Sequence, residues 1–228
     1  MHRLPLSWHT LAPETWKNGG GSTRTLAVSS GKVGATRTTQ DIDTKPGATR
    51  TAEDIDAPAN WRVSIAAIVR DGAYSSFSGY QRVSIVLSGA GVVLRHEDTT
   101  IELLPGIPTV FDGAPAWQST LIDGPVSVLN LFARQGNVEA VVAHERGLSD
   151  DSTEVRLDTQ FALSHPQAQP LVWTRIVVAT AAQQYQRDDG LAPLALQGNE
   201  FWIESHTCLA PHLGLHAIVI SLREHCPL

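Results

Sequence analysis

Apolar and polar residues alternate most regularly over residues 61–94, which give the clearest structural signal in the chain. Trp61, Val63 and Ile65 alternate with smaller or polar residues, and the same period of two returns over residues 82–87. Successive side chains of a β-strand point to opposite faces of the sheet, so this period predicts strands with one buried face. Turns are predicted where the alternation stops, at Gly72, Gly79 and Gly89–Gly91. The stretch therefore predicts three antiparallel strands.

Similar strand-like segments occupy most of the remaining sequence, and no long stretch has helical periodicity. They cover residues 4–11, 101–104, 109–113, 117–122 and 126–132, and later residues 171–178, 191–197, 201–204 and 217–222. Segment 137–147 is compatible with either a helical turn or a strand. Thirteen prolines and 18 glycines favour short elements joined by turns. We predict an all-β fold of two antiparallel units, residues 1–134 and the shorter 135–228.

A short repeat interrupts the first unit. The pattern Gly-Ser/Ala-Thr-Arg-Thr begins at Gly21, Gly34 and Gly47. This period is too short for a solenoid and the copies are polar, so we predict a duplicated, loosely ordered loop insertion over residues 31–58. Arg37 and Arg50 repeat Arg24, but only Arg24 follows the Trp-Lys-Asn-Gly run.

Composition narrows the function classes. The formal net charge is −6 and basic residues do not cluster, which argues against nucleic acid as a partner. The N-terminus lacks the apolar core of a signal peptide, and no apolar run is long enough to cross a bilayer. We therefore expect a cytoplasmic protein without a membrane partner. Cys208 and Cys226 are compatible with two reduced thiols or one bridge, and their spacing does not decide between them.

Arg82 is the first candidate for ligand chemistry. Strand alternation places Arg82 and Ser84 on the face opposite Val83 and Ile85. That face is either exposed to solvent, as most arginines are, or part of a pocket. If the face is enclosed, Arg82 needs an anionic partner, because an unpaired buried charge costs about 3–5 kcal/mol.

The glycine-rich segment 16–25 is the second candidate. A Walker phosphate loop places its lysine after the glycines, whereas Lys17 precedes them, which excludes that motif. Asn18, Thr23 and Arg24 offer an amide, a hydroxyl and a guanidinium that suit a carboxylate. The alternative is a glycine-rich turn with solvated flanks.

Metal binding and nucleophilic catalysis find little support. His206, Cys208, His212 and His216 cluster in sequence, but Pro211 breaks the run and no Cys-x-x-Cys pair supports a zinc site. We therefore interpret these histidines as structural or surface residues. The sequence has no Gly-x-Ser-x-Gly nucleophile elbow, and it predicts no catalytic residue.

Five segments together resemble the HutD/Ves family in their order and approximate spacing. They are Trp16–Arg24, Trp61–Ala66, Phe77–Arg82, Leu87–Gly91 and Phe111–Gly113. The resemblance covers residues 1–134 well and the rest loosely. The chain differs from the family in its duplicated loop and in reading Val128-Leu129-Asn130 where the family usually reads Asp-Leu-Asn.

The resemblance implies a bicupin fold, with two cupin-like β-barrels in one chain, and a small acidic ligand. Residues 72–82 and 105–113, where cupins carry metal-binding histidines, contain none, so we expect no metal and no cofactor. Arginine, amide and hydroxyl groups suit a carboxylated ligand, and aromatic rings suit the apolar wall of a pocket. The predicted ligand-binding residues are Asn18, Thr23, Arg24, Ser64, Phe77, Arg82, Phe111 and Asn130.

The leading hypothesis, which rests on the resemblance, is a non-catalytic cytosolic protein that binds N-formyl- or formimino-glutamate or urocanate and regulates histidine utilisation. One alternative is a cupin enzyme, such as an isomerase or a metal-dependent oxygenase. The other is a stress-induced protein-interaction module whose duplicated loop contacts a partner. The oligomeric state stays open, with a homodimer among the options.

Overall fold

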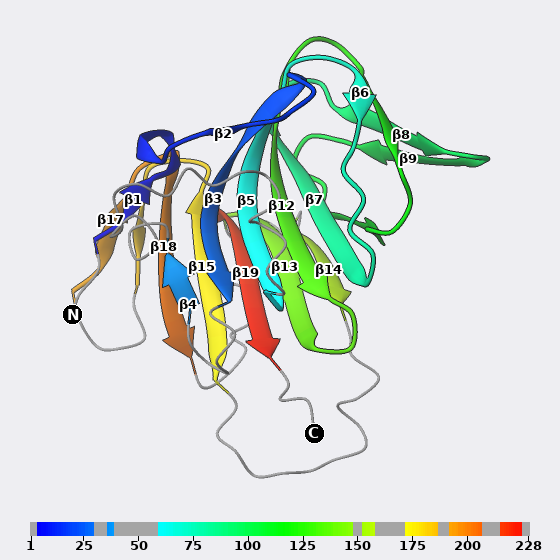
Figure 1. Cartoon of the computed structure of the whole chain (residues 1–228). Coiled ribbons are helices and arrows are strands. Elements are labelled where there is room, and N and C mark those ends of the chain that lie inside the picture. Colours follow the sequence, from blue (N-terminus) through cyan, green and yellow to red (C-terminus); the bar gives the residue numbers. More distant parts are fainter. Residues whose placement is uncertain are drawn as a thin grey trace, which may run out of the picture.

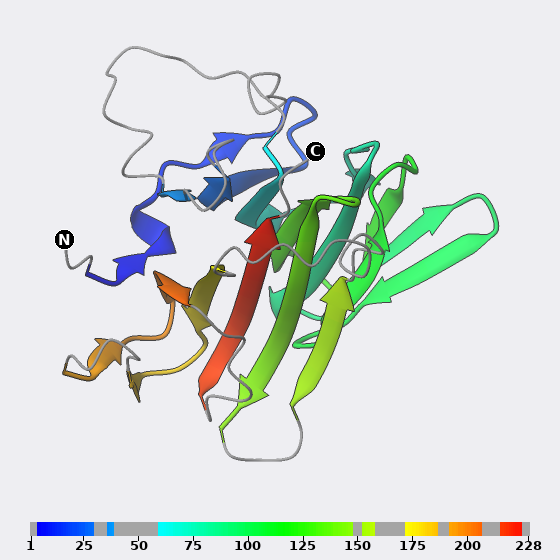
Figure 2. The same cartoon turned by 90° about the horizontal axis from the view of Figure 1, so that it is seen from below.

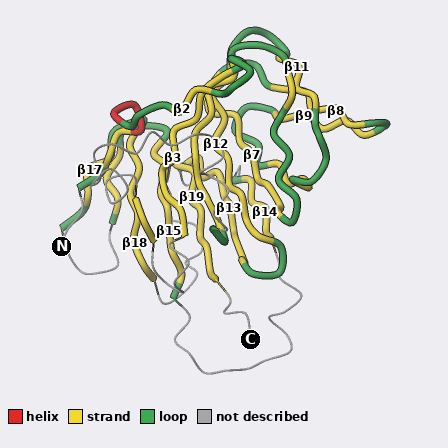
Figure 3. The backbone as a smooth tube through the Cα atoms, viewed as in Figure 1, coloured by secondary structure: helices red, strands yellow, loops and turns green. Residues whose placement is uncertain are grey.

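The structure is a computed structural model that describes residues 4–29, 36–38, 59–147, 152–157, 172–186, 192–206 and 215–224. Its sheets are antiparallel, and within these ranges the only helical element is a 3₁₀ turn, η1 (Trp8–Thr10) (Figure 3). The all-β prediction is confirmed. The predicted insertion 31–58 lies outside the described residues, apart from the strand β4 (Thr36–Thr38), which pairs with β3 (Gly21–Ser29).

The first large sheet is built from the N-terminal part of the chain. Its strand order is β10-β7-β12-β5-β3-β2. The bounds are β2 (Glu14–Thr15), β5 (Trp61–Ile68), β7 (Tyr80–Ser88), β10 (Thr109–Asp112) and β12 (Val126–Arg134). A register shift between Thr25 and Ala27 marks a β-bulge in β3 where it pairs with β5.

The second large sheet has the order β1-β18-β15-β19-β13-β14. Its strands are β1 (Leu6–Ser7), β13 (Val138–Arg146), β14 (Thr153–Leu157), β15 (Trp173–Ala179), β18 (Glu200–His206) and β19 (His216–Glu224). The ambiguous segment 137–147 is thus a strand inside this sheet. Segment 4–11 forms β1 and η1, and β1 pairs with β18, so the N-terminus is attached to the sheet of the second half (Figure 1).

Two smaller sheets complete the fold. One has the order β6-β11-β8-β9, with β6 (Gly72–Ala73), β8 (Val92–His96), β9 (Thr99–Leu103) and β11 (Gln118–Leu121). Its β8–β9 hairpin projects away from the large sheets (Figure 1). The other pairs β16 (Gln183–Tyr185) with β17 (Leu194–Leu196). No helix in the described part of the chain is long and apolar enough to cross a membrane.

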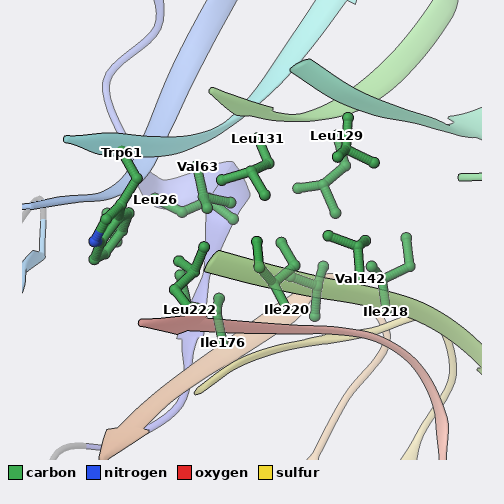
Figure 4. Packing of buried hydrophobic residues seen from close by; sticks show 14 of the residues in the cluster. Leu26, Trp61, Val63, Leu129, Leu131, Val142, Ile176, Ile218, Ile220 and Leu222 are labelled. Atoms are coloured by element: carbon green, nitrogen blue, oxygen red, sulfur yellow. The ribbon is translucent and has the colours of Figure 1, made fainter. Parts of the chain in front are cut away.

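The two large sheets pack face to face (Figure 2). Trp61, Val63 and Leu131 of the first sheet meet Ile176 and Ile220 of the second, all at most 2% exposed (Figure 4). These residues are the apolar members of the period-two pattern. Residues at the apolar positions point into this shared core, and the residues between them point to the opposite face of the sheet.

The opposite face of each large sheet has its own apolar cluster. In the first half, Ile68, Val86 and Val128 pack with residues of the small sheet such as Leu94 and Leu103. In the second half the cluster is Val177, Ala179, Tyr185, Leu196, Trp202, Leu215, Ala217 and Val219. The polar members of the strand pattern lie beside these clusters, which is where a site can form.

Candidate ligand-binding cavity in the first half

Rows of side chains cross the first large sheet on the face away from the shared core. In one row, Arg62 of β5 and Arg82 of β7 each lie opposite Phe132 of β12. The next row along the strands is Ser64, Asn130 and Ser84. The row after that is Ala66, Val128 and Val86, which leads into the apolar cluster of this half. The side chains on this face therefore become less polar from the first row to the third. The small sheet's apolar cluster covers the third row, and open space remains beside the first two.

A cavity of about 340 Å³ occupies this polar end. Strands contribute Thr23, Arg62, Ser64, Arg82, Asn130 and Phe132. The connection after β6 contributes Tyr74, Ser75 and Phe77, and the N-terminal segment adds Trp16. The volume and the mixture of aromatic walls with a few polar groups are those of a small-molecule site.

Arg82 is buried in the wall of the cavity, with 3% of its surface exposed. Its Nη1 donates a hydrogen bond to the carbonyl oxygen of Ser75 (3.2 Å), and its Nη2 donates to Oδ1 of Asn130 (3.3 Å). Its Nε is buried without a hydrogen-bond partner. Both acceptors are neutral, so the guanidinium charge is held in place without being neutralised.

Aromatic rings surround the same guanidinium. Its central carbon lies 4.3 Å from the ring centroid of Tyr74, 4.5 Å from Phe132 and 5.1 Å from Phe111. Burial, partly offset by Tyr74 and reinforced by the charge of Arg62, lowers the pKa of Arg82 to about 10. The group therefore stays charged at neutral pH although its surroundings oppose the charge.

Asn130 positions Arg82 through a network of hydrogen bonds. Besides the guanidinium, its Oδ1 accepts hydrogen bonds from Ser84 Oγ (2.7 Å) and Tyr74 Oη (3.4 Å). Its Nδ2 donates to the carbonyl oxygen of Val128 (3.3 Å), which fixes the orientation of the amide. Asn130 is 2% exposed, so it shapes the cavity mainly through Arg82.

Arg62 brings a second guanidinium to the cavity. Its central carbon lies 4.7 Å from the ring centroid of Phe132, the ring that also contacts Arg82. Phe77 packs edge-on against Phe132 with centroids 4.7 Å apart, and it too lies near both arginines. Two cations therefore share one aromatic wall of the cavity, and the carboxylate of Glu14 also belongs to the lining.

The glycine-rich segment builds the hairpin beside the cavity. Gly21 is required for close packing, since a Cβ there would lie 2.2 Å from the carbonyl oxygen of Ala67. Trp16 Nε1 donates a hydrogen bond to Thr23 Oγ1 (2.8 Å), so both side chains are fixed in the cavity wall. Asn18 instead turns into the loop and accepts a hydrogen bond from the Gly20 amide (2.9 Å).

Arg24 lies on the other face of β3. It pairs in register with Ile65, a residue of the shared core, and its Nε donates to the carbonyl oxygen of Leu11 (3.1 Å). Phe111 lies under Arg82 in the apolar cluster and is 5% exposed. Of the predicted residues, the structure brings five together around the cavity: Thr23, Ser64, Phe77, Arg82 and Asn130. Asn18, Arg24 and Phe111 lie outside its lining.

The family follows from a match over most of the chain. The HutD family model matches residues 8–200, which include strands of both large sheets. The chain belongs to the HutD family. Among curated proteins, an uncharacterized 21.2 kDa protein in the hutC 3′ region of Pseudomonas putida is 28% identical over 186 residues, which cover 81% of this chain and 82% of the relative. Protein Ves of Citrobacter koseri is 35% identical over 85 residues, 36% of this chain and 44% of the relative.

A solved structure supports the fold of this HutD chain. HutD from Pseudomonas fluorescens SBW25, in a formate condition, aligns with a TM-score of 0.52 and 23% identity, and the match covers 95% of this chain and 90% of that one. The likeness supports the antiparallel all-β fold of the chain. Among the described residues of this chain, no three His, Cys, Asp or Glu side chains are placed to hold a metal. Cys208 and His212 of the sequence cluster lie outside the described ranges.

Sequence reasoning missed Arg62, Tyr74 and Phe132. The signal for Arg62 was present, because it lies two residues before Ser64 and so shares its strand face. The same rule separates Thr23 from Arg24, which are adjacent in a strand and point to opposite faces. Phe132 carries the same signal, because it lies two residues after Asn130 on β12. Tyr74 carries none, since only the fold of a connection brings it to Arg82.

Proposed function

We propose that this HutD protein binds a small carboxylated metabolite in the cavity beside Arg82, and that it contributes to histidine utilisation in the cytoplasm by binding rather than by catalysis. N-formylglutamate, formiminoglutamate and urocanate are the ligands to test first. Each carries a carboxylate for a guanidinium and a polar or planar group for the remainder of the cavity.

The proposal depends on the burial of Arg82 without a counter-charge. It is buried with neutral hydrogen-bond acceptors, its Nε has no hydrogen-bond partner, and no ion pair links it to a carboxylate in the described part of the chain. A buried charge without a counter-charge is costly, and a carboxylate bound in the adjoining cavity would supply the counter-charge.

The rest of the cavity suits an organic acid better than a simple inorganic anion. Trp16, Tyr74, Phe77 and Phe132 provide apolar walls, and Thr23 and Ser64 provide hydroxyls. The name of one relative agrees with a role in histidine utilisation, because it places that protein in a hutC 3′ region.

Titration calorimetry with the three acids tests the proposal. We expect saturable binding of at least one acid, and a loss of affinity of about 10- to 100-fold in Arg82→Gln, because hydrogen bonds to charged groups contribute about 1.5–3 kcal/mol each. Arg24→Gln is the matched control, since it removes an arginine on the opposite face of β3, and it should bind as the wild type does.

Two results would contradict the proposal. One is the absence of binding for the whole panel by folded wild-type protein. The other is equal loss of affinity in Arg82→Gln and Arg24→Gln, which would indicate a site elsewhere or a general loss of structure. Circular dichroism of each variant separates a local effect from unfolding.

A further inference from the structure

Among the residues whose burial the structure describes, each large sheet carries one deeply buried arginine, and the two lie at the same topological position. β7 lies between β12, the last strand of its half, and β10, and β15 lies between β19, the last strand of its half, and β18. In both halves a small strand pair lies in sequence between the arginine strand and one of its neighbours: β8–β9 between β7 and β10, and β16–β17 between β15 and β18. Arg82 of β7 and Arg175 of β15 both face away from the shared core, and they are 3% and 2% exposed.

The two arginines differ in the residue that faces them from the neighbouring strand. Phe111 of β10 lies opposite Arg82, and Glu204 of β18 lies opposite Arg175. Arg82 therefore meets an aromatic ring where Arg175 meets a carboxylate. Nη1 of Arg175 donates hydrogen bonds to Oε1 of Glu204 (3.3 Å) and to Tyr185 Oη (3.2 Å).

Several hydrogen-bond donors surround the carboxylate of Glu204. Its Oε1 also accepts a hydrogen bond from Tyr185 Oη and contacts Nε2 of His206 at 2.5 Å, and its Oε2 accepts one from Trp202 Nε1 at 3.2 Å. Burial opposes ionisation of Glu204, but the hydrogen bonds from His206 and Tyr185 outweigh burial and hold the pKa of the carboxyl below its usual value. The second half thus contains an arginine, a tyrosine, an indole and a histidine arranged around one carboxylate.

We propose that the Glu204 carboxylate gives Arg175 the counter-charge that a ligand carboxylate gives Arg82 in the first half, so that the second half is an anion site closed by its own chain. The unmodified protein then binds one carboxylate ligand per chain, at Arg82. Removing the Glu204 side chain leaves its four donors around a carboxylate-sized space, which creates a second site for small carboxylates such as formate or acetate.

This inference rests on the proposed function for the comparison with Arg82, but its test does not. All chains carry Arg82→Gln, so any response from the first half is absent. Thermal unfolding is followed in sodium formate and in sodium chloride at equal ionic strength. Glu204→Ala should lower the Tm by about 5–15 °C in chloride, and formate should recover part of that loss in a saturable manner.

Two variants serve as controls. Glu154→Ala removes a carboxylate of the same half that pairs with Arg156 at the surface, and it should show no specific formate response. Glu204→Gln removes the charge but fills the space, and it should be destabilised without being rescued by formate. Rescue confined to Glu204→Ala supports the proposal.

Other outcomes overturn it. A formate response of the same size in Glu204→Ala and Glu154→Ala, or in Glu204→Ala and Glu204→Gln, would show that formate acts non-specifically. If Glu204→Ala does not fold in chloride, its refolding yield from urea decides: a higher yield in formate supports the internal carboxylate, and equal yields contradict it. Failure of wild-type binding at Arg82 would contradict the proposed function and leave this result standing.

Discussion

Arg82 shows how the neighbours of one residue decide what its charge does. Asn130 holds the guanidinium with a neutral amide oxygen, while Tyr74 and Phe132 offer their rings. Arginine in such surroundings is positioned but not neutralised, and an incoming carboxylate finds a fixed, weakly hydrated cation. The neutrality of Asn130 is therefore as important for binding as its shape.

The substitution Asn130→Asp tests whether the neutral amide of Asn130 is needed for ligand binding. The substitution keeps the shape of the side chain and places a carboxylate 3.3 Å from Arg82 Nη2, where the amide oxygen now lies. We expect the folded state to persist and the affinity for a carboxylated ligand to fall about 10-fold or more, because the new charge competes for the guanidinium. Calorimetry with the tightest-binding acid of the panel measures the change.

A second aspartate controls for added charge alone. Asn137→Asp adds the same charge beyond the cavity, where the amide donates to Oδ1 of Asn60. It should leave the affinity unchanged. Wild-type affinity in Asn130→Asp would show that Arg82 does not hold the ligand's carboxylate.

At the scale of elements, one contact attaches the connection between β9 and β10 to the second half. His144 of β13 makes a hydrogen bond through Nδ1 with the carbonyl oxygen of Gly106 (2.7 Å), and Thr153 Oγ1 donates to the same oxygen (3.4 Å). Gly106 has a φ of +71°, and a Cβ there would lie 2.8 Å from the His144 ring. The histidine and the glycine fit together only in this tight arrangement.

This contact predicts a pH dependence of stability. Burial, opposed by the Gly106 hydrogen bond and reinforced by Arg146, lowers the pKa of His144 below the ordinary value of 6.5. The unfolded chain then takes up a proton before the folded chain does, so the free energy of unfolding should decrease as the pH falls through 6.5. Urea unfolding between pH 7.5 and 5 should show this decrease, and His144→Gln should make it smaller.

Thr153 provides the matched control for that series. Its hydroxyl donates to the same Gly106 oxygen and does not titrate, so Thr153→Val should leave the pH dependence as it is in the wild type. A slope that is the same in His144→Gln and the wild type would show that His144 does not link the protein's stability to pH.

The whole molecule is held together by a core that both halves share. Leu131 of the first sheet and Ile220 of the second are 1% and 0% exposed in the same cluster (Figure 4). The N-terminal strand β1 also pairs with β18, so the chain joins the two sheets at its beginning as well as at its middle. Neither sheet buries this apolar face without the other.

Single truncations in the shared core should therefore destabilise both halves together. Leu131→Ala and Ile220→Ala should each lower the free energy of unfolding by about 2–5 kcal/mol, through lost burial and the cavity that remains. Tryptophan fluorescence and far-ultraviolet circular dichroism should report one coincident transition in each variant. Two separated transitions would indicate halves that unfold independently.

The sequence by itself determined many of the strands and their faces, because alternation is a local property that each strand carries in its own residues. The strand β3 was not among those predicted. The series Trp61, Val63 and Ile65 identified the buried face of β5, and Arg82 was correctly assigned to the opposite face. The family pattern likewise pointed to Ser64, Phe77 and Asn130, which line the cavity.

Tertiary structure alone decided which polar groups meet. Strand register placed Arg62 and Arg82 on either side of Phe132, although these residues are far apart in the sequence, while Arg24 came to lie on the face toward the other sheet. Pairing also placed Phe111 opposite Arg82 and Glu204 opposite Arg175. The physical reason is that the spatial neighbours of a buried charge decide whether it has a counter-charge within the protein. Long-range strand pairing determines which residues become those neighbours.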